Sequence, residues 1–190
     1  MKRFILDKLI DWKNSKDRKP LILKGARQVG KTYILKEFGE NFYDNVAYFN
    51  FDHDDGLAEL FSNTKDPKRI IEQLTLANGK KINPRTTLII FDEIQECPNA
   101  LNSLKYFCEE ANEYHVACAG SLLGIRLSKT SFPVGKVDFL SLYPMTFSEF
   151  LFADNSENLV TVMKETKEIK TIPKLFENML IEKLKIYYIV

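Results

Sequence analysis

The chain has no long apolar segment: no run of about 18 apolar residues occurs in its 190 residues, so no membrane-spanning helix is expected. It also has almost no net charge, because 27 lysines and arginines stand against 26 aspartates and glutamates. Such a balance creates no overall field that would favour nucleic acid or a membrane surface. The N-terminus begins like a secretion signal, but Asp7, Lys8 and Asp11 interrupt its apolar stretch. We therefore expect a cytoplasmic protein without a membrane partner.

Cysteine is also scarce. The three cysteines, Cys97, Cys108 and Cys118, are widely spaced and form no Cys-x-x-Cys pair, and the two histidines are not at metal-binding spacing. Structural zinc needs four well-spaced ligands, so no zinc site is expected, and the odd number of cysteines favours reduced thiols. A hydrophobic content of 45% over 190 residues is enough for one well-formed core.

The most informative motif is a phosphate-binding loop of the pattern G-x-x-x-x-G-K-[ST] at residues 25–32. Residues 20–24 before it predict a short buried strand, and the amphipathic segment after it predicts a helix ended by Gly39. Backbone N–H groups of such a loop and the positive end of the helix dipole attract phosphate. Lys31 is expected to neutralise the β- and γ-phosphates, and the Thr32 hydroxyl to hold Mg²⁺.

The residues expected to contact a nucleotide are the whole loop and the residue after it: Gly25, Ala26, Arg27, Gln28, Val29, Gly30, Lys31, Thr32 and Tyr33. Arg27 has a second interpretation. In most loops of this kind the side chain at its position points away from the phosphates, which favours a structural salt bridge.

A second motif, at residues 87–93, is an apolar strand that ends in the carboxylates Asp92 and Glu93. Parallel strands form continuous apolar runs, and ligands bind beyond their carboxyl ends. Asp92 is therefore expected beside Thr32, where it can hold Mg²⁺ directly or through water, and Glu93 is expected to activate an attacking water as general base. Such an acidic pair suits hydrolysis better than transfer to a small molecule. The N-K-x-D motif of GTPases is missing from its required place, so GTP is disfavoured.

Strands alternate with helices along the chain, which predicts an α/β fold with a mostly parallel sheet. Five strands are expected, at residues 20–24, 46–51, 87–93, 115–119 and 137–142. We assign residues 1–153 to one nucleotide-binding domain, with an N-terminal helix at residues 4–16. Residues 154–190 are assigned to a helical segment, the start of a lid or C-terminal region. The apolar end at residues 186–190 predicts that the natural protein continues.

Helix-capping signals mark two further elements. Asp66 before Pro67 predicts a helix N-terminus, and Gly79 predicts the end of the same helix. Thr146 and Glu149 have the spacing of a capping box, in which each side chain bonds to the other residue's backbone. Gln95, which follows the acidic pair, could orient water or cap the next helix, and the cap is favoured.

Five segments together resemble the AAA+ superfamily ATPases of bacteria and archaea in which the ATPase domain precedes a C-terminal domain of unknown function: residues 25–32, 91–96, 119–124, 131–137 and 142–150. The resemblance is clearest over residues 21–151. It implies a P-loop NTPase fold, a three-layer α/β/α sandwich with strand order 5-1-4-3-2, with Walker A and Walker B motifs that bind ATP and Mg²⁺. Members usually continue into a winged-helix-like segment and a nuclease-like domain, which implies a C-terminal effector.

The resemblance also implies roles for single residues. It assigns Lys31 and Thr32 to phosphate and Mg²⁺, Asp92 to Mg²⁺ and Glu93 to water activation. Ser121, at the tip of the strand expected between the two motif strands, is a candidate sensor of the γ-phosphate; the alternative is a plain turn serine. Arg126 is a candidate arginine finger on a neighbour's γ-phosphate, which would imply a homo-oligomer. An exposed loop arginine is an equal alternative.

The expected function is ATP binding and Mg²⁺-dependent hydrolysis, slow in this chain alone. The alternative is a nucleotide-dependent switch, in which binding rather than turnover sets the shape of a C-terminal effector or partner surface. A weaker alternative is a DNA-processing ATPase, which no basic stripe in this chain supports.

Overall fold

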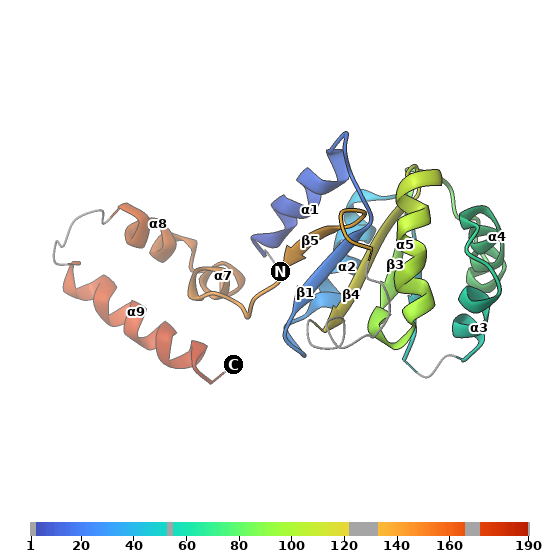
Figure 1. Cartoon of the computed structure of the whole chain (residues 1–190). Coiled ribbons are helices and arrows are strands. Elements are labelled where there is room, and N and C mark those ends of the chain that lie inside the picture. Colours follow the sequence, from blue (N-terminus) through green and yellow to red (C-terminus); the bar gives the residue numbers. More distant parts are fainter. Residues whose placement is uncertain (1–2, 53–54, 122–132, 166–171, 190) are drawn as a thin grey trace. The chain divides into compact units, whose positions relative to one another are not determined.

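The computed structural model describes residues 3–52, 55–121, 133–165 and 172–189 (Figure 1). Its helices are α1 (Ile5–Asn14), α2 (Lys31–Phe42), α3 (Asp55–Asn63), α4 (Pro67–Asn78), α5 (Pro98–Glu110), α7 (Phe147–Ala153), α8 (Glu157–Glu165), α9 (Lys174–Tyr187) and the short 3-10 helix η1 (Ile94–Glu96). Its strands are β1 (Leu21–Gly25), β2 (Asn45–Asn50), β3 (Thr87–Asp92), β4 (His115–Ser121) and β5 (Asp138–Ser141). None of these helices has the length and apolar composition needed to span a bilayer.

The chain forms two compact units. One comprises Asp7–Tyr143, and the other joins Met1–Leu6 to Pro144–Val190. The sheet and its covering helices belong to the first unit, and α7, α8 and α9 to the second. The domain boundary predicted at residue 153 stays a prediction.

The five strands form one parallel sheet in the order β2-β3-β4-β1-β5. This confirms the predicted α/β fold and strand order. Because β1, β4 and β3 are neighbouring parallel strands, their carboxyl ends lie at the same end of the sheet, where Gly25 of β1 pairs with Ser121 of β4. The phosphate-binding loop and the acidic pair therefore emerge at the same end of the sheet, with β4 between their strands.

Both faces of the sheet are covered, which explains why β3 is buried along its whole length. On one face Phe91 packs edge-on against Phe61 of α3 and Phe107 of α5, within a cluster that also contains α4 residues. On the other face α2 packs against β1, β2, β3 and β4. The covering of β3 keeps the strand before the acidic pair rigid and dry.

The prediction that Gly39 ends the helix after the loop is wrong, because α2 continues to Phe42. Gly39 is buried inside the helix, where it faces the sheet. A Cβ there would lie 2.5 Å from Cγ2 of Val46 on β2 and 3.2 Å from Cδ2 of Leu88 on β3. The residue is thus explained by the close approach of helix and sheet, since a helix interior otherwise disfavours glycine.

The other capping predictions are confirmed. The Asp66 side chain accepts a hydrogen bond from the Lys68 backbone N–H at 2.9 Å, and Gly79 ends α4 in the left-handed conformation. In the second unit, Thr146 and Glu149 form the expected capping box at the start of α7. Glu149 also accepts from the Arg3 side chain at 3.1 Å, which ties the N-terminal segment to α7 within that unit.

A buried histidine lies at the opposite end of the sheet from the phosphate-binding loop. His115, the first residue of β4, is only 5% exposed, and its Nδ1 lies 2.7 Å from the Tyr43 hydroxyl. The Trp12 ring packs against it edge-on. Burial, together with the positive charges of Arg18 and Lys13, lowers the pKa of His115 to about 4. The fold therefore holds this imidazole neutral.

We expect the free energy of unfolding to fall by about 2 kcal/mol between pH 7.5 and pH 5 through His115 alone. The unfolded chain binds a proton near the ordinary histidine pKa, whereas the folded chain resists protonation until about pH 4. The contribution is thus fully present above pH 6.5 and lost as the pH falls. Urea denaturation at the two pH values measures it. His115→Gln is expected to lose much less stability over this interval, and an equal loss in both proteins would contradict the assignment.

Candidate active site

The phosphate-binding loop is shaped by two glycines that no other residue could replace without strain. A Cβ on Gly25 would lie 2.4 Å from the backbone oxygen of Leu142, just after β5. Gly30, the residue before α2, has a left-handed backbone with φ of 89°. Gln28 also adopts a positive φ, of 63°. The loop therefore turns back on itself and presents the N-terminus of α2 to its concave side.

Lys31 reaches over this concavity. Its ammonium group donates hydrogen bonds to the backbone oxygens of Gly25, at 3.2 Å, and Ala26, at 2.7 Å. Burial lowers the pKa of Lys31, while the negative charges of Glu93 and Asp92 act against that shift. A partly desolvated ammonium held by loop carbonyls is well placed to exchange them for a stronger acceptor such as a phosphate.

The structure brings Asp92 and Thr32 together. Thr32, on the first turn of α2, donates its hydroxyl to Oδ2 of Asp92 at 2.8 Å. The same oxygen accepts the Tyr48 hydroxyl at 2.8 Å, and Oδ1 accepts the backbone N–H of Glu93 at 3.0 Å. Burial and the hydrogen bond to Asp92 raise the pKa of Tyr48, so the hydroxyl stays protonated and donates. Asp92, only 5% exposed, is held by three donors.

Glu93 lies just beyond the end of β3 in a left-handed conformation, with φ of 49° and ψ of 42°. This backbone turns the chain sharply from the buried strand into η1 and leaves the Glu93 side chain in the pocket. Oε2 of Glu93 accepts a hydrogen bond from the side-chain amide of Gln95, which also reaches Oε1 of Glu96 at 3.3 Å. The interpretation of Gln95 as a helix cap is therefore wrong: it links two carboxylates.

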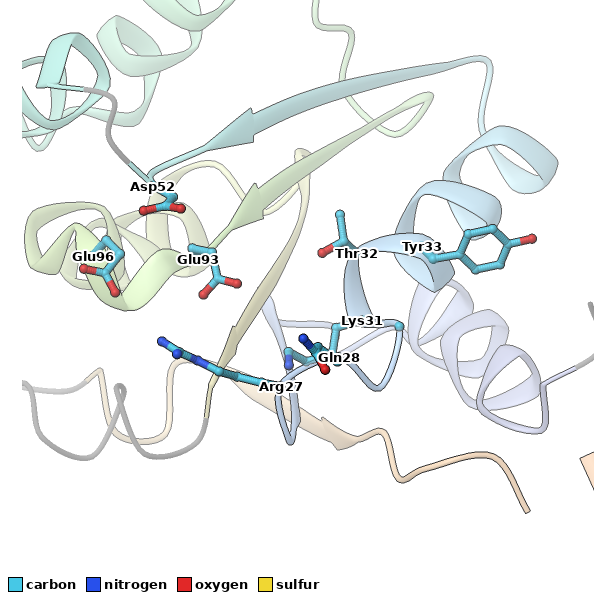
Figure 2. A pocket seen from close by; sticks show the side chains of 9 residues that line it. Arg27, Gln28, Lys31, Thr32, Tyr33, Asp52, Glu93 and Glu96 are labelled. Atoms are coloured by element: carbon cyan, nitrogen blue, oxygen red, sulfur yellow. The ribbon is translucent and has the colours of Figure 1, made fainter. Parts of the chain in front are cut away.

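These residues surround a pocket of about 550 Å³, within the size range of small-molecule sites. It is lined by residues of the loop, of α2 and of the two neighbouring strand ends: Arg27, Gln28, Gly30, Lys31, Thr32, Tyr33, Asp52, Glu93 and Glu96. Figure 2 shows the Arg27 side chain extended across the pocket toward the side that carries Glu93 and Glu96. Both interpretations of Arg27, contact with a nucleotide and a structural salt bridge, therefore stay predictions.

Other predicted residues have different places. Gly25 and Ala26 hold the Lys31 ammonium through their carbonyls, and Val29 packs against Gly25. The Ser121 backbone ends β4 opposite Gly25, and its side chain lies outside the described part of the structure. Arg126 lies outside the described residues altogether. The sensor and arginine-finger assignments therefore stay predictions.

Two oxygen donors of the site could take part in holding a magnesium ion. Among the residues that the structure describes, no group of three or more histidine, cysteine or acidic side chains could hold a metal ion. Thr32 and Asp92 nevertheless offer two hard oxygen donors whose oxygens are 2.8 Å apart. Mg²⁺ commonly takes one or two protein oxygens and completes its shell with substrate phosphates and water. The residues present therefore fit an ion that arrives with a polyphosphate.

The sequence profile of the AAA domain family matches residues 17–151, which is more than half of the chain and includes the loop and the acidic pair. The chain belongs to the AAA domain family. This membership, together with the loop geometry, makes it a nucleotide-binding domain of the ATPase type. No significant match was found among curated proteins.

Two solved structures are similar to this AAA domain. Drosophila ORC bound to DNA matches with a TM-score of 0.52 and 16% identity, over 92% of this chain and 50% of that one. AMPPCP-bound DnaA from Aquifex aeolicus matches with a TM-score of 0.44 and 14% identity, over 93% of this chain and 53% of that one. At 16% identity, the similarity to Drosophila ORC shows a shared fold and nothing more. The chain spans about half the length of these solved chains.

Sequence patterns missed three residues of the AAA domain's site. Tyr48 lies in the strand expected at residues 46–51 and was assigned no role in the site, but its hydroxyl contacts Asp92. Asp52 and Glu96 line the pocket although neither belongs to a phosphate-binding motif. The available signal was positional: Asp52 follows β2, the neighbour of β3, and Glu96 ends the turn that Glu93 begins.

Proposed function

We propose that this AAA domain binds ATP with Mg²⁺ and hydrolyses the terminal phosphoanhydride bond. The observation that carries the proposal is the Thr32–Asp92 pair, with its oxygens 2.8 Å apart, in a site that also contains Lys31 and the Glu93 carboxylate. The groups that would bind phosphate, hold the metal and activate water thus come from two separate parts of the chain, the start of α2 and the end of β3. A purely structural role of the loop would not require these groups to gather at the carboxyl end of the sheet.

The residues of the loop would bind and orient the nucleotide. Lys31 would leave the carbonyls of Gly25 and Ala26 and donate instead to phosphate oxygens, joined by backbone N–H groups at the start of α2. Thr32 and Asp92 would hold Mg²⁺, which when bound neutralises charge on the phosphates. Because the Thr32 and Asp92 oxygens already lie together, these two metal-binding groups need little reorganisation as charge develops on the phosphates.

Glu93 would act on the attacking water. Its carboxylate lines the pocket, and the Gln95 amide fixes one of its oxygens, which leaves the other able to accept a proton from water. The left-handed backbone at Glu93 sets this direction, because an extended residue there would continue the line of β3. The water oxygen would then attack the γ-phosphorus in line, its proton passing to Glu93, as the bond from that phosphorus to the departing ADP oxygen breaks.

We expect slow turnover by this chain alone. Arg27 is the one arginine among the pocket-lining residues that the structure describes, and an arginine finger supplied by a neighbouring copy would act only in an assembly. Phosphate release from ATP is expected at about 10⁻³ s⁻¹ or below, the range of phosphate-loop hydrolases that lack such a finger. The assay compares ATP with GTP, each in Mg²⁺ and in EDTA. Turnover above about 1 s⁻¹ would contradict the slow-turnover proposal.

A further inference from the structure

The residue with the least expected position near the site is Tyr48. Strands β2 and β3 pair in register, with Tyr48 opposite Ile90 and Asn50 opposite Asp92. Because side chains alternate along a strand, Tyr48 and Asp92 lie on the same face of the sheet, two positions apart. The length of a tyrosine spans that offset, and the hydroxyl reaches Oδ2 of Asp92 at 2.8 Å.

The Tyr48 ring is held from the helix side as well. The ammonium of Lys36, on α2, lies 3.5 Å from the centre of the ring, a favourable cation–π contact. Lys36 is four residues after Thr32, so the two side chains lie on the same face of α2, one turn apart. A single helix thus positions both the hydroxyl that meets Asp92 and the cation that covers Tyr48.

The three donors on Asp92 are not equivalent. The Glu93 N–H is fixed by the backbone, but the Thr32 hydroxyl can rotate and is needed for a second task, the contact with Mg²⁺. Tyr48 has no such second task, since it is not among the pocket-lining residues that the structure describes. Its half-buried ring is covered by the Lys36 ammonium, and its O–H donates to Oδ2 independently of the Thr32 hydroxyl.

We propose that Tyr48 is a positioning residue, which fixes the carboxylate of Asp92 in the orientation that receives the Mg²⁺ of a bound nucleotide. The proposal rests on the proposed function and deepens it. Tyr48 acts through Asp92 and touches neither the nucleotide nor the metal. Its removal should therefore leave metal-free nucleotide binding unchanged and weaken only the part that depends on Mg²⁺.

The test is Tyr48→Phe, which removes one hydroxyl and keeps the ring under Lys36. The affinity for AMPPCP is measured by titration calorimetry in EDTA and then at increasing Mg²⁺ concentrations. We expect equal affinities in EDTA, and an about tenfold higher Mg²⁺ concentration for half of the affinity gain, in line with the usual cost of removing an outer hydrogen bond to a metal ligand.

Tyr43→Phe is the matched control. It removes a tyrosine hydroxyl bonded at 2.7 Å to His115 at the opposite end of the sheet, so it reports the general cost of losing such a group. If the two variants change the Mg²⁺ dependence equally, or Tyr48→Phe matches the unmodified protein, the proposal for Tyr48 is overturned. If the unmodified protein binds AMPPCP in neither condition, the proposed function fails and the role of Tyr48 fails with it.

Discussion

Replacing Glu93 by glutamine is expected to slow ATP hydrolysis by about 10²–10⁴-fold and to leave ATP binding intact. Glutamine keeps the shape of the side chain and its place in the pocket, but it cannot accept the proton of the attacking water. Glu93 follows the buried strand β3 and is itself only partly buried, so this substitution should not disturb the core. Phosphate release under saturating ATP and Mg²⁺ measures the rate, and calorimetry measures the affinity.

Glu96→Gln is the matched control for this variant. Glu96 lines the same pocket, carries the same charge and contacts the same Gln95 amide. Its change should leave the hydrolysis rate close to that of the unmodified protein. A Glu93→Gln protein that still hydrolyses ATP at the original rate would exclude Glu93 as the base. The variant also separates turnover from switching, because a switch driven by ATP binding would keep its output without hydrolysis.

Replacing Lys31 by alanine is expected to weaken ATP binding by about 100-fold or more, since charge-assisted hydrogen bonds to phosphate contribute roughly 1.5–3 kcal/mol each. Within the described part of the structure, this ammonium donates to two loop carbonyls, those of Gly25 and Ala26. Removing it should therefore cost the fold little. Equal thermal unfolding temperatures for Lys31→Ala and the unmodified protein, both without nucleotide, would show that the substitution weakens binding and not the fold.

Lys24→Ala is the control for Lys31→Ala. Lys24 lies in β1, next to the loop, but its ammonium is 3.5 Å from the centre of the Phe139 ring. Lys24→Ala therefore removes one positive charge, as Lys31→Ala does, from a nearby position in the chain. If Lys24→Ala weakened ATP binding as much as Lys31→Ala, the effect would be one of general charge, and the specific role of Lys31 would be wrong.

Much of this architecture follows from local sequence. The apolar runs of β1 and β3 predict buried parallel strands, and the carboxyl ends of such strands share one edge. That reasoning alone places Asp92 near Thr32. The capping signals at Asp66 and Thr146 are equally local, because the capping side chain bonds within a few residues of its own position.

What sequence reasoning missed depends on contacts between distant segments. Gly39 was predicted to end a helix, and only the close approach of α2 to Val46 on β2 explains why glycine stands there. Tyr48 has the spacing of a core aromatic, and only the register of β2 on β3 reveals that its hydroxyl meets Asp92. Gln95 is a local exception: it contacts two neighbouring carboxylates in a turn where Glu93 adopts a left-handed backbone, which a non-glycine residue rarely does.

The most direct test of the central claim is a calorimetric titration of ATP into the unmodified protein, once with Mg²⁺ and once with EDTA, alongside the same titrations with GTP. We predict saturable ATP binding that is tighter with Mg²⁺ and that exceeds GTP binding. The Mg²⁺ dependence would report the Thr32–Asp92 pair, and the binding itself the loop and Lys31. A folded protein that binds no nucleotide in either condition would contradict the claim that this pocket is an ATP·Mg²⁺ site.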